Sequence, residues 1–290
     1  MVVLLRKLML LLVLTCFLTL FLDYGVKTFF SKIHRRCKTD ISNVNFDIVF
    51  FGSSRVIHGL NNKLFNNCTN ISSLNMGWPA VNPREVYAAI EVFLFKNYKP
   101  KYIFIQVDEE HDLIEEDKSA QFELLKFYSK SIIDDYYSDN ARFIMDFPLL
   151  ASMKNRDFGW REVLKTTFRN NLYEEMETKN FGYVKIEPKA YEESPNAPII
   201  PNQNKNVWIS KSIESCKKRG VKVILYTAPY FYENIKDRFD FLKIYGVPYY
   251  NFSNLLKSKK SFKDYNHTNS IGTDSLTMEL AKTFNEQNAL

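Results

Sequence analysis

The chain has 290 residues, of which 46% are apolar and 15% aromatic, which is enough for a packed core and too many for an intrinsically disordered protein. Its formal charge of +6 is concentrated at the N-terminus: residues 1–38 hold seven Lys and Arg and one acidic residue, which leaves 32 charges of each sign in the other 252 residues. A neutral globular part has no basic stripe of the kind that phosphate backbones select, so we exclude nucleic acid as a partner.

An uncharged apolar run, LMLLLVLTCFLTLFL at residues 8–22, lies between Arg6-Lys7 and a second basic cluster at residues 32–38. As a helix it spans about 22 Å, less than the ~30 Å hydrocarbon core of a bilayer, but neighbouring apolar residues extend it. A cleaved signal peptide has an apolar stretch of similar length, yet no small-x-small cleavage site follows here. We therefore predict an uncleaved membrane anchor. Its orientation stays open, because the excess of positive charge after the run would keep the domain in the cytoplasm.

The sequence contains no clear pattern for a metal site or a set of disulfide bonds. The four cysteines show no C-x-x-C spacing, and one of them lies inside the apolar run. Acidic residues and a histidine do cluster at residues 108–112 (DEEHD) like the ligands of a hard metal ion, but no second cluster accompanies them. We predict neither a metal nor another cofactor.

Short β-branched or aromatic runs bounded by turn formers predict buried strands at residues 47–52, 102–108, 221–228 and 248–252, with a weaker candidate at 71–77. Helical patterns lie between them, at residues 83–95, 207–220 and 232–246. Continuously apolar strands that alternate with helices predict an α/β fold, in which a mostly parallel, doubly wound sheet is covered on both faces. Ligands of such sheets bind beyond the carboxyl ends of the strands.

The alternation breaks between residues 109 and 206, which are rich in aromatic and acidic side chains. This segment is too long for a structureless loop inside a compact domain. We predict an insertion of mostly helical character, which is either a cap over the crevice or a docking surface. The chain then divides into an anchor with a basic juxtamembrane segment (1–38) and one α/β domain (39–290) that carries the insertion.

Two motifs lie at opposite ends of the α/β domain. The first strand ends in Gly52-Ser53-Ser54, a tight turn that offers hydroxyls either for nucleophilic attack or for capping the next helix. Near the C-terminus, Asp264 and His267 are three residues apart in DYNH. These two are either a carboxylate that orients an imidazole or a turn former followed by a surface histidine.

Together, FFGSSR and DYNH resemble two blocks of the SGNH, or GDSL-like, hydrolase superfamily. The family's Gly-x-Ser block follows the first strand and maps the nucleophile onto Ser54, and its C-terminal Asp-x-x-His block maps onto Asp264 and His267. SLNMGWP matches the second block more loosely, with Gly77 and the nearby Asn75. QVDEEHD stands where the third block normally has Gly-x-Asn-Asp, so the usual Asn donor is absent.

The resemblance covers residues 46–108 and 207–285 and implies an SGNH/flavodoxin-like three-layer fold with a Ser-His-Asp triad. In such a triad His267 takes the proton of Ser54, and Asp264 holds the imidazole in the required tautomer. The backbone N–H groups of Ser54 and Gly77 would then stabilise the oxyanion.

The missing third donor has one candidate replacement and one complication. The side chain of Asn75 could substitute for it, whereas Asp108, as a carboxylate, would repel the oxyanion. Two further side chains are candidates for substrate binding. Arg55 would bind an anionic or hydroxyl-rich group, unless it forms a surface ion pair, and Trp78 would stack on a sugar ring, unless it packs in the core.

The Gly-Ser-Ser form, the membrane helix and the insertion are most similar to the membrane-anchored branch of the superfamily, which serves acyl transfer to cell-envelope polymers. This implies an extracytoplasmic domain, against the charge count above. It also implies a serine esterase or O-acyltransferase that acts on acyl, chiefly acetyl, esters of an envelope glycan. The expected partners are the membrane, the acylated polysaccharide and a polytopic membrane acyltransferase. The alternative is a non-catalytic accessory that binds a glycan or such an acyltransferase.

Overall fold

The computed structural model describes residues 2–33, 46–79, 81–95, 98–112, 181–193, 203–232 and 236–288. Three of the elements in these ranges, labelled η, are 3-10 helices. In chain order the elements are α1 (Val2–Ile33), β1 (Ile48–Gly52), α2 (Ser54–Ile57), α3 (Asn62–Thr69), β2 (Ser73–Gly77), α4 (Pro83–Phe95), β3 (Tyr102–Gln106), η1 (Glu109–Asp112), α9 (Val207–Lys218), β4 (Lys222–Thr227), η6 (Lys236–Tyr245), β5 (Tyr249–Asn251), η7 (Lys259–Ser261) and α10 (Ser270–Asn288).

The strands form one parallel sheet in the order β2-β1-β3-β4-β5. This confirms the predicted α/β class and its parallel, doubly wound sheet. From β1 the chain goes to β2 on one side and later to β3 on the other, so the strand order reverses between β1 and β3. In open α/β sheets the ligand crevice forms at such a switch point, beyond the carboxyl ends of the strands. The Gly52-Ser53-Ser54 turn lies at that point.

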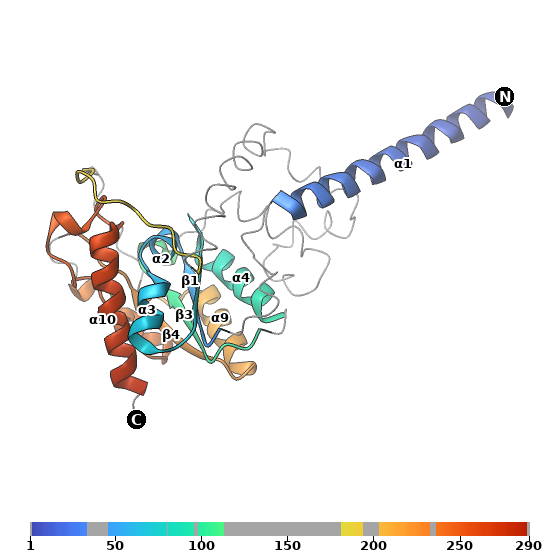
Figure 1. Ribbon diagram of the computed structural model, residues 1–290. Coiled ribbons are helices and arrows are strands. Elements are labelled where there is room, and N and C mark those ends of the chain that lie inside the picture. Colours follow the sequence, from blue (N-terminus) through green and yellow to red (C-terminus); the bar gives the residue numbers. More distant parts are fainter. Residues whose placement is uncertain are drawn as a thin grey trace.

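Alternation along the strands produces two hydrophobic cores. Val49 and Phe51 of β1 face the core beneath α4 and α9, whereas Phe50 faces the core beneath α3 and α10. Strand β3 follows the same rule, with Ile103 and Ile105 on the first face and Phe104 on the second. Figure 1 shows the two helix layers on opposite sides of the sheet. Because successive strand residues point to opposite faces, a continuously apolar strand requires both layers.

The predicted elements differ from the observed ones mainly in detail. All five strands are present and one to two residues shorter at their ends than the sequence runs suggest. The helix predicted at residues 232–246 is the 3-10 helix η6, and the short helix α3 was not predicted. The predicted insertion lies largely outside the described residues. Its segment 181–193 is described, contains no helix and packs against α2 and β2 through backbone hydrogen bonds from Val184 N–H to Ile57 O and from Asn75 N–H to Phe181 O, each 2.9 Å long.

Helix α1 projects away from the α/β domain (Figure 1). Its 19-residue stretch Val3–Phe21 is long and apolar enough to cross a membrane, and none of that stretch is buried against the rest of the protein.

Candidate active site

The turn after β1 gives its two serines different roles. A Cβ on Gly52 would lie 2.6 Å from Val56 Cγ2 and 2.7 Å from Gln106 Cβ, so the sharp exit from β1 requires glycine. Ser53 is the N-cap of α2, and its buried hydroxyl accepts the N–H of Arg55 at 3.4 Å. Ser54 is the first residue of the helix and is partly exposed. The capping role that sequence reasoning gave to either serine therefore belongs to Ser53.

The second motif forms a tight loop between η7 and α10. An antiparallel bridge joins Phe262 to Thr268, and Lys263 N–H donates to the carbonyl of His267 at 2.8 Å. Within this loop the Asp264 Oδ1 accepts the backbone N–H groups of His267 at 2.8 Å and of Asn266 at 3.1 Å. Asp264 is thus both a turn former and a side chain held in one orientation.

The fold brings Ser54, His267 and Asp264 together. His267 Nε2 lies 2.8 Å from Ser54 Oγ, and His267 Nδ1 lies 3.0 Å from each carboxylate oxygen of Asp264. The side chain of His267 is 26% exposed and that of Asp264 is 18% exposed, so solvent reaches these two side chains at the carboxyl end of the sheet. This is the geometry in which a base contacts a nucleophile and a third group orients the base.

The carboxylate determines the proton positions in this arrangement. Burial acts to raise the pKa of Asp264, but the side-chain hydrogen bond and charge of His267, with the backbone N–H groups of His267 and Asn266, outweigh it and lower that pKa below its ordinary value of 3.8. An ionised carboxylate only accepts hydrogen bonds, so Nδ1 of His267 carries a proton. Nε2 of the neutral ring then has a lone pair that faces the Ser54 hydroxyl.

Two of the three predicted oxyanion donors have other partners. The Gly77 N–H donates to Asn75 Oδ1 at 2.9 Å, and Asn75 Nδ2 donates to the carbonyls of Val56 at 2.7 Å and Leu60 at 3.3 Å. The amide of Asn75 therefore connects β2 to the end of α2 instead of facing the nucleophile. The Ser54 N–H, the third predicted donor, meets no acceptor within the described part of the chain.

Arg55 forms an ion pair, as one of the two readings of the sequence expected, but the pair is buried and not on the surface. Its side chain is 1% exposed and forms a buried ion pair with Asp108, whose side chain is fully buried. The guanidinium also donates to the carbonyl of Pro229 at 2.6 Å and stacks 3.8 Å from the ring centroid of Tyr230. With every face of the guanidinium covered by protein, Arg55 is not available to a substrate.

Trp78 packs in the core, which was the alternative to sugar binding in the sequence analysis. It is 7% exposed and belongs to the core beneath α4 and α9, so it offers no ring face to a sugar. The prediction of Trp78 as a substrate-binding residue is corrected accordingly. Its position follows from the backbone, because the Trp78 N–H donates to Gly52 O at 2.8 Å and continues the pairing of β2 with β1.

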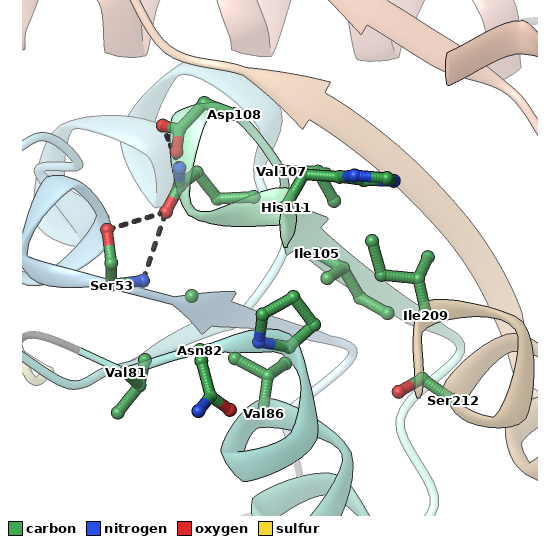
Figure 2. A pocket seen from close by; sticks show the side chains of 13 residues that line it. Ser53, Val81, Asn82, Val86, Ile105, Val107, Asp108, His111, Ile209 and Ser212 are labelled. Atoms are coloured by element: carbon green, nitrogen blue, oxygen red, sulfur yellow. Dashed lines mark hydrogen bonds between the residues drawn. The ribbon is translucent and has the colours of Figure 1, made fainter. Parts of the chain in front are cut away.

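A small pocket lies between α4, α9 and the carboxyl ends of β1 and β3. Val81, Val86, Ile105 and Ile209 form its apolar wall, and Ser53, Asp108 and His111 line its polar side (Figure 2). None of Ser54, His267 and Asp264 lines this pocket. It is therefore separate from the site at which the serine faces the histidine.

Sequence reasoning missed an aromatic pair beside the C-terminal loop. The rings of Tyr191 and Phe231 pack edge to face with centroids 5.5 Å apart, and both side chains are partly exposed. Backbone bonds attach them to the loop: Phe231 N–H donates to Tyr265 O at 2.8 Å, and Glu192 N–H donates to Lys263 O at 2.7 Å. No sequence signal marked Tyr191, because its place beside the loop depends on the return of residues 181–193.

The role of Gln106 was also not predicted from the sequence. The Gln106 Oε1 accepts the backbone N–H and the hydroxyl of Ser53, both at 3.0 Å, and its Nε2 donates to Asp108 (Figure 2). A signal was present in the sequence, since a Gln within the apolar run YIFIQVD is a buried polar side chain that requires partners.

Comparison with known proteins gives remote structural similarity only. No family model and no curated protein matches the chain. Similar solved structures include a lipolytic protein of the G-D-S-L family from Desulfitobacterium hafniense DCB-2, at 11% identity and a TM-score of 0.41, covering 82% of this chain and 99% of the other. A GDSL-like lipase from Bacteroides thetaiotaomicron VPI-5482 is 12% identical with a TM-score of 0.40 and covers 90% and 100%.

A third structure, described as a platelet activating factor from Streptococcus pneumonia, is 12% identical with a TM-score of 0.42 and covers 93% of this chain and 96% of the other. Similarity this remote does not identify a reaction.

Proposed function

We propose that this chain is a serine esterase or O-acyltransferase that works through an acyl-serine intermediate on Ser54. The observation that carries the proposal is the continuous contact from Asp264 through His267 to Ser54. Ser54 Oγ attacks the acyl carbonyl carbon while its proton passes to His267 Nε2. The tetrahedral intermediate collapses, the alcohol leaves with that proton, and the acyl group stays on Ser54.

The second half of the reaction decides the product. An incoming hydroxyl gives its proton to His267 Nε2, attacks the acyl-serine carbonyl and regenerates Ser54. If the hydroxyl is that of water, the chain is an esterase, and if it belongs to a sugar, the chain is a transferase. The choice depends on how well the site excludes water around the acyl-serine.

Labelling of Ser54 tests the proposal. The full-length chain in detergent micelles is treated with a fluorophosphonate, which reacts with activated serines, and the modified peptide is mapped. We expect an adduct on Ser54 that is lost in His267→Ala and kept in Ser275→Ala, whose serine is partly exposed on α10 and donates to the carbonyl of Ile271 in its own helix. A folded wild-type chain that forms no adduct contradicts the proposal.

We further propose that the ester belongs to a glycan of the cell envelope. The aromatic pair Tyr191 and Phe231 supports this, because aromatic faces beside a catalytic loop pack well against sugar rings. Lys259 lies 4.9 Å from the Tyr191 ring centroid, forms an ion pair with Glu193 at 3.0 Å and adds polar groups to the same surface.

The glycan proposal predicts a selective effect. Phe231→Ala is expected to raise KM for acetylated oligosaccharides more than for p-nitrophenyl acetate, which has no sugar to stack. The control is Phe95→Ala, which removes a 45% exposed ring at the C-terminal end of α4. Equal changes in KM for both substrates contradict a sugar-binding role for the pair.

The location is part of the proposal. Helix α1 would anchor the chain in a membrane and place the α/β domain outside the cytoplasm, next to an envelope polysaccharide and a polytopic acyltransferase. The number of basic residues after the apolar stretch argues for the opposite orientation. Protease treatment of intact spheroplasts decides between them: digestion of the domain supports the extracytoplasmic location, and protection contradicts it.

One observation favours the non-catalytic alternative. The side chain of Asn75 and the N–H of Gly77 are bonded to each other instead of aimed at an oxyanion, and the loss of one donor alone reduces a rate by roughly 10²-fold or more. An accessory protein that binds a glycan or a membrane acyltransferase needs no such donors. Saturable binding of the polysaccharide by a chain that forms no Ser54 adduct would support the accessory role.

A further inference from the structure

The residues before and after Ser54 both contact side chains at the carboxyl end of β3. Ser53, which precedes Ser54, contacts Gln106 through its backbone N–H and its hydroxyl, both at 3.0 Å (Figure 2). Arg55, which follows Ser54, forms its buried ion pair with Asp108. Gln106 is the last residue of β3, and Asp108 lies two residues beyond it.

The two contacts are parts of one network, because Gln106 Nε2 donates to the same carboxylate oxygen of Asp108 that Arg55 contacts. Gln106 and Asp108 are 6% and 1% exposed, and Ser53 and Arg55 are 3% and 2% exposed. A hydrogen bond to a charged group is worth most when it is shielded from water in this way. Ser54 is the partly exposed residue between two buried, anchored neighbours.

We propose that Gln106 and Asp108 are positioning residues, which act through Ser53 and Arg55 to hold Ser54 against His267. The proposal rests on the proposed serine chemistry and assigns the third strand a function in it. Neither residue contacts the reacting atoms. Their effect is on the direction in which the Ser54 hydroxyl leaves the backbone.

The local structure explains why such a support is needed. Helix α2 has only four residues, and a single helical turn is not stable by itself. His267, in contrast, comes from a loop that is 213 residues away in the sequence, so no local element sets its distance from Ser54. A displacement of about 1 Å at a reacting group costs on the order of 10²-fold in rate.

The network also accounts for the departure from the usual third block. An unpaired Asp108 carboxylate near the crevice would disfavour a developing oxyanion, but here the guanidinium of Arg55 compensates its charge. The third strand therefore supplies an orienting contact to the nucleophile turn in place of an oxyanion donor. This assigns roles to Gln106 and Asp108 that the sequence comparison left empty.

The test separates positioning from stability. Asp108→Asn leaves the charge of Arg55 buried and uncompensated, so it is expected to lower both the melting temperature and the rate of fluorophosphonate labelling. In the double variant Arg55→Met with Asp108→Leu no buried charge remains, and the melting temperature is expected to recover, since apolar replacements of a buried ion pair are often neutral or stabilising. Its labelling rate per folded molecule is expected to stay about 10- to 100-fold below that of the wild type.

The control is Glu91→Gln. Glu91 is a buried acid on α4 that accepts hydrogen bonds from Ser215 and pairs with Arg219 at 3.1 Å, and it does not belong to the network around Ser54. It is expected to lower the melting temperature and leave the labelling rate per folded molecule unchanged. All measurements use the full-length chain in micelles.

The outcomes distinguish this proposal from the proposed function. If the wild type is labelled on Ser54 and the double variant is labelled equally fast, the ion pair is only structural and the positioning role is wrong, while the serine chemistry stands. If the folded wild type is not labelled, both proposals fail together. A double variant that has recovered its stability and is still labelled slowly supports the positioning role.

Discussion

The Nε2 of His267 lies 2.8 Å from the Oγ of Ser54, although the two residues are 213 positions apart in the chain. The contact exists because β1 ends in a turn that places Ser54 beyond the carboxyl end of the strand. The loop before α10 passes the same end of the sheet. Asp264 continues the line, at 3.0 Å from His267 Nδ1.

Replacement of Ser54 by alanine removes the hydroxyl from this line. Under the proposed function, ester hydrolysis or acyl transfer is expected to fall by at least about 10³-fold, because removal of the proposed nucleophile leaves only binding and residual oxyanion stabilisation. The melting temperature should change little, since Ser53 caps α2 and remains in place. Turnover of p-nitrophenyl acetate and circular dichroism measure the two quantities, and full activity in a folded Ser54→Ala chain would assign the chemistry to another residue.

Asp264→Asn changes the proton positions and not the shape of the loop. The asparagine oxygen can still accept the backbone N–H groups of His267 and Asn266, so the fold should persist. Its amide group can also donate to Nδ1, which favours the wrong tautomer and is expected to lower kcat by roughly 10⁴-fold. Asp264→Ala, which loses the loop contacts as well, should in addition lower the melting temperature. A kcat that is unchanged in Asp264→Asn would show that Asp264 only shapes the turn.

The lowered pKa of Asp264 predicts a dependence of stability on pH. Because that pKa lies below 3.8 in the folded chain, the unfolded chain binds a proton more readily. The resulting stabilisation is complete above 3.8 and is lost as the pH falls through the folded pKa. The loss should be smaller in Asp264→Asn when the free energy of unfolding is measured by urea titration at acidic pH, and an identical slope in the two proteins would contradict it.

Trp78 is expected to stabilise the fold and not to bind a sugar. Trp78→Ala removes a ring that is 7% exposed, and truncation of a buried Trp costs about 3 to 5 kcal/mol of unfolding free energy. Trp208→Ala is the matched control, because Trp208 is partly exposed on α9 and should cost less. Urea titration compares the two. An unchanged stability with a raised KM for glycan esters would restore the stacking role that the sequence suggested.

The fold was predictable because its signals are local. Each strand is a short apolar run, and the helical pattern at residues 83–95 coincides with α4. A parallel sheet then brings the carboxyl ends of its strands together, which predicts that the Gly52-Ser53-Ser54 turn lies at the ligand crevice. The pairing of Ser54 with Asp264 and His267 was an expectation from the resemblance of the two motifs to a known family, not from the sheet. The 3-10 form of η6 could not, since a helical period does not distinguish the two helix types over ten residues.

Side-chain directions could not be predicted. Whether Arg55 points outward or inward depends on Asp108, and the two meet only because β1 pairs with β3 in the observed register. Asn75 was read as an oxyanion donor because it lies near Gly77, but its amide donates to the carbonyls of Val56 and Leu60. Both cases depend on tertiary contacts that leave no periodic signal in the sequence.

His111 makes a set of buried hydrogen bonds at the base of the insertion. Its Nδ1 lies 2.7 Å from Asp112 Oδ1, and its Nε2 lies 2.8 Å from the Tyr245 hydroxyl. The hydroxyl accepts the Asn206 N–H at 2.6 Å, and Asn206 Nδ2 donates to the His111 carbonyl at 2.6 Å. His111 and Asn206, which lie near the two ends of the insertion, are thus joined directly and through the Tyr245 hydroxyl.

This arrangement predicts a loss of stability in mild acid. Burial lowers the pKa of His111 below its ordinary value of 6.5, and the hydrogen bond and charge of Asp112 offset only part of that effect. The unfolded chain therefore takes up a proton more readily, so the stabilisation is complete above 6.5 and is lost as the pH falls through the folded pKa. Protonation also converts Nε2 of His111 into a donor, which removes the acceptor of the Tyr245 hydroxyl.

Urea unfolding of His111→Gln between about pH 5 and 7 should show a free energy of unfolding that depends less on pH than that of the wild type. Tyr245→Phe, which keeps the buried imidazole, should be less stable and keep the dependence; equal slopes for wild type and His111→Gln would show that the imidazole does not sense pH.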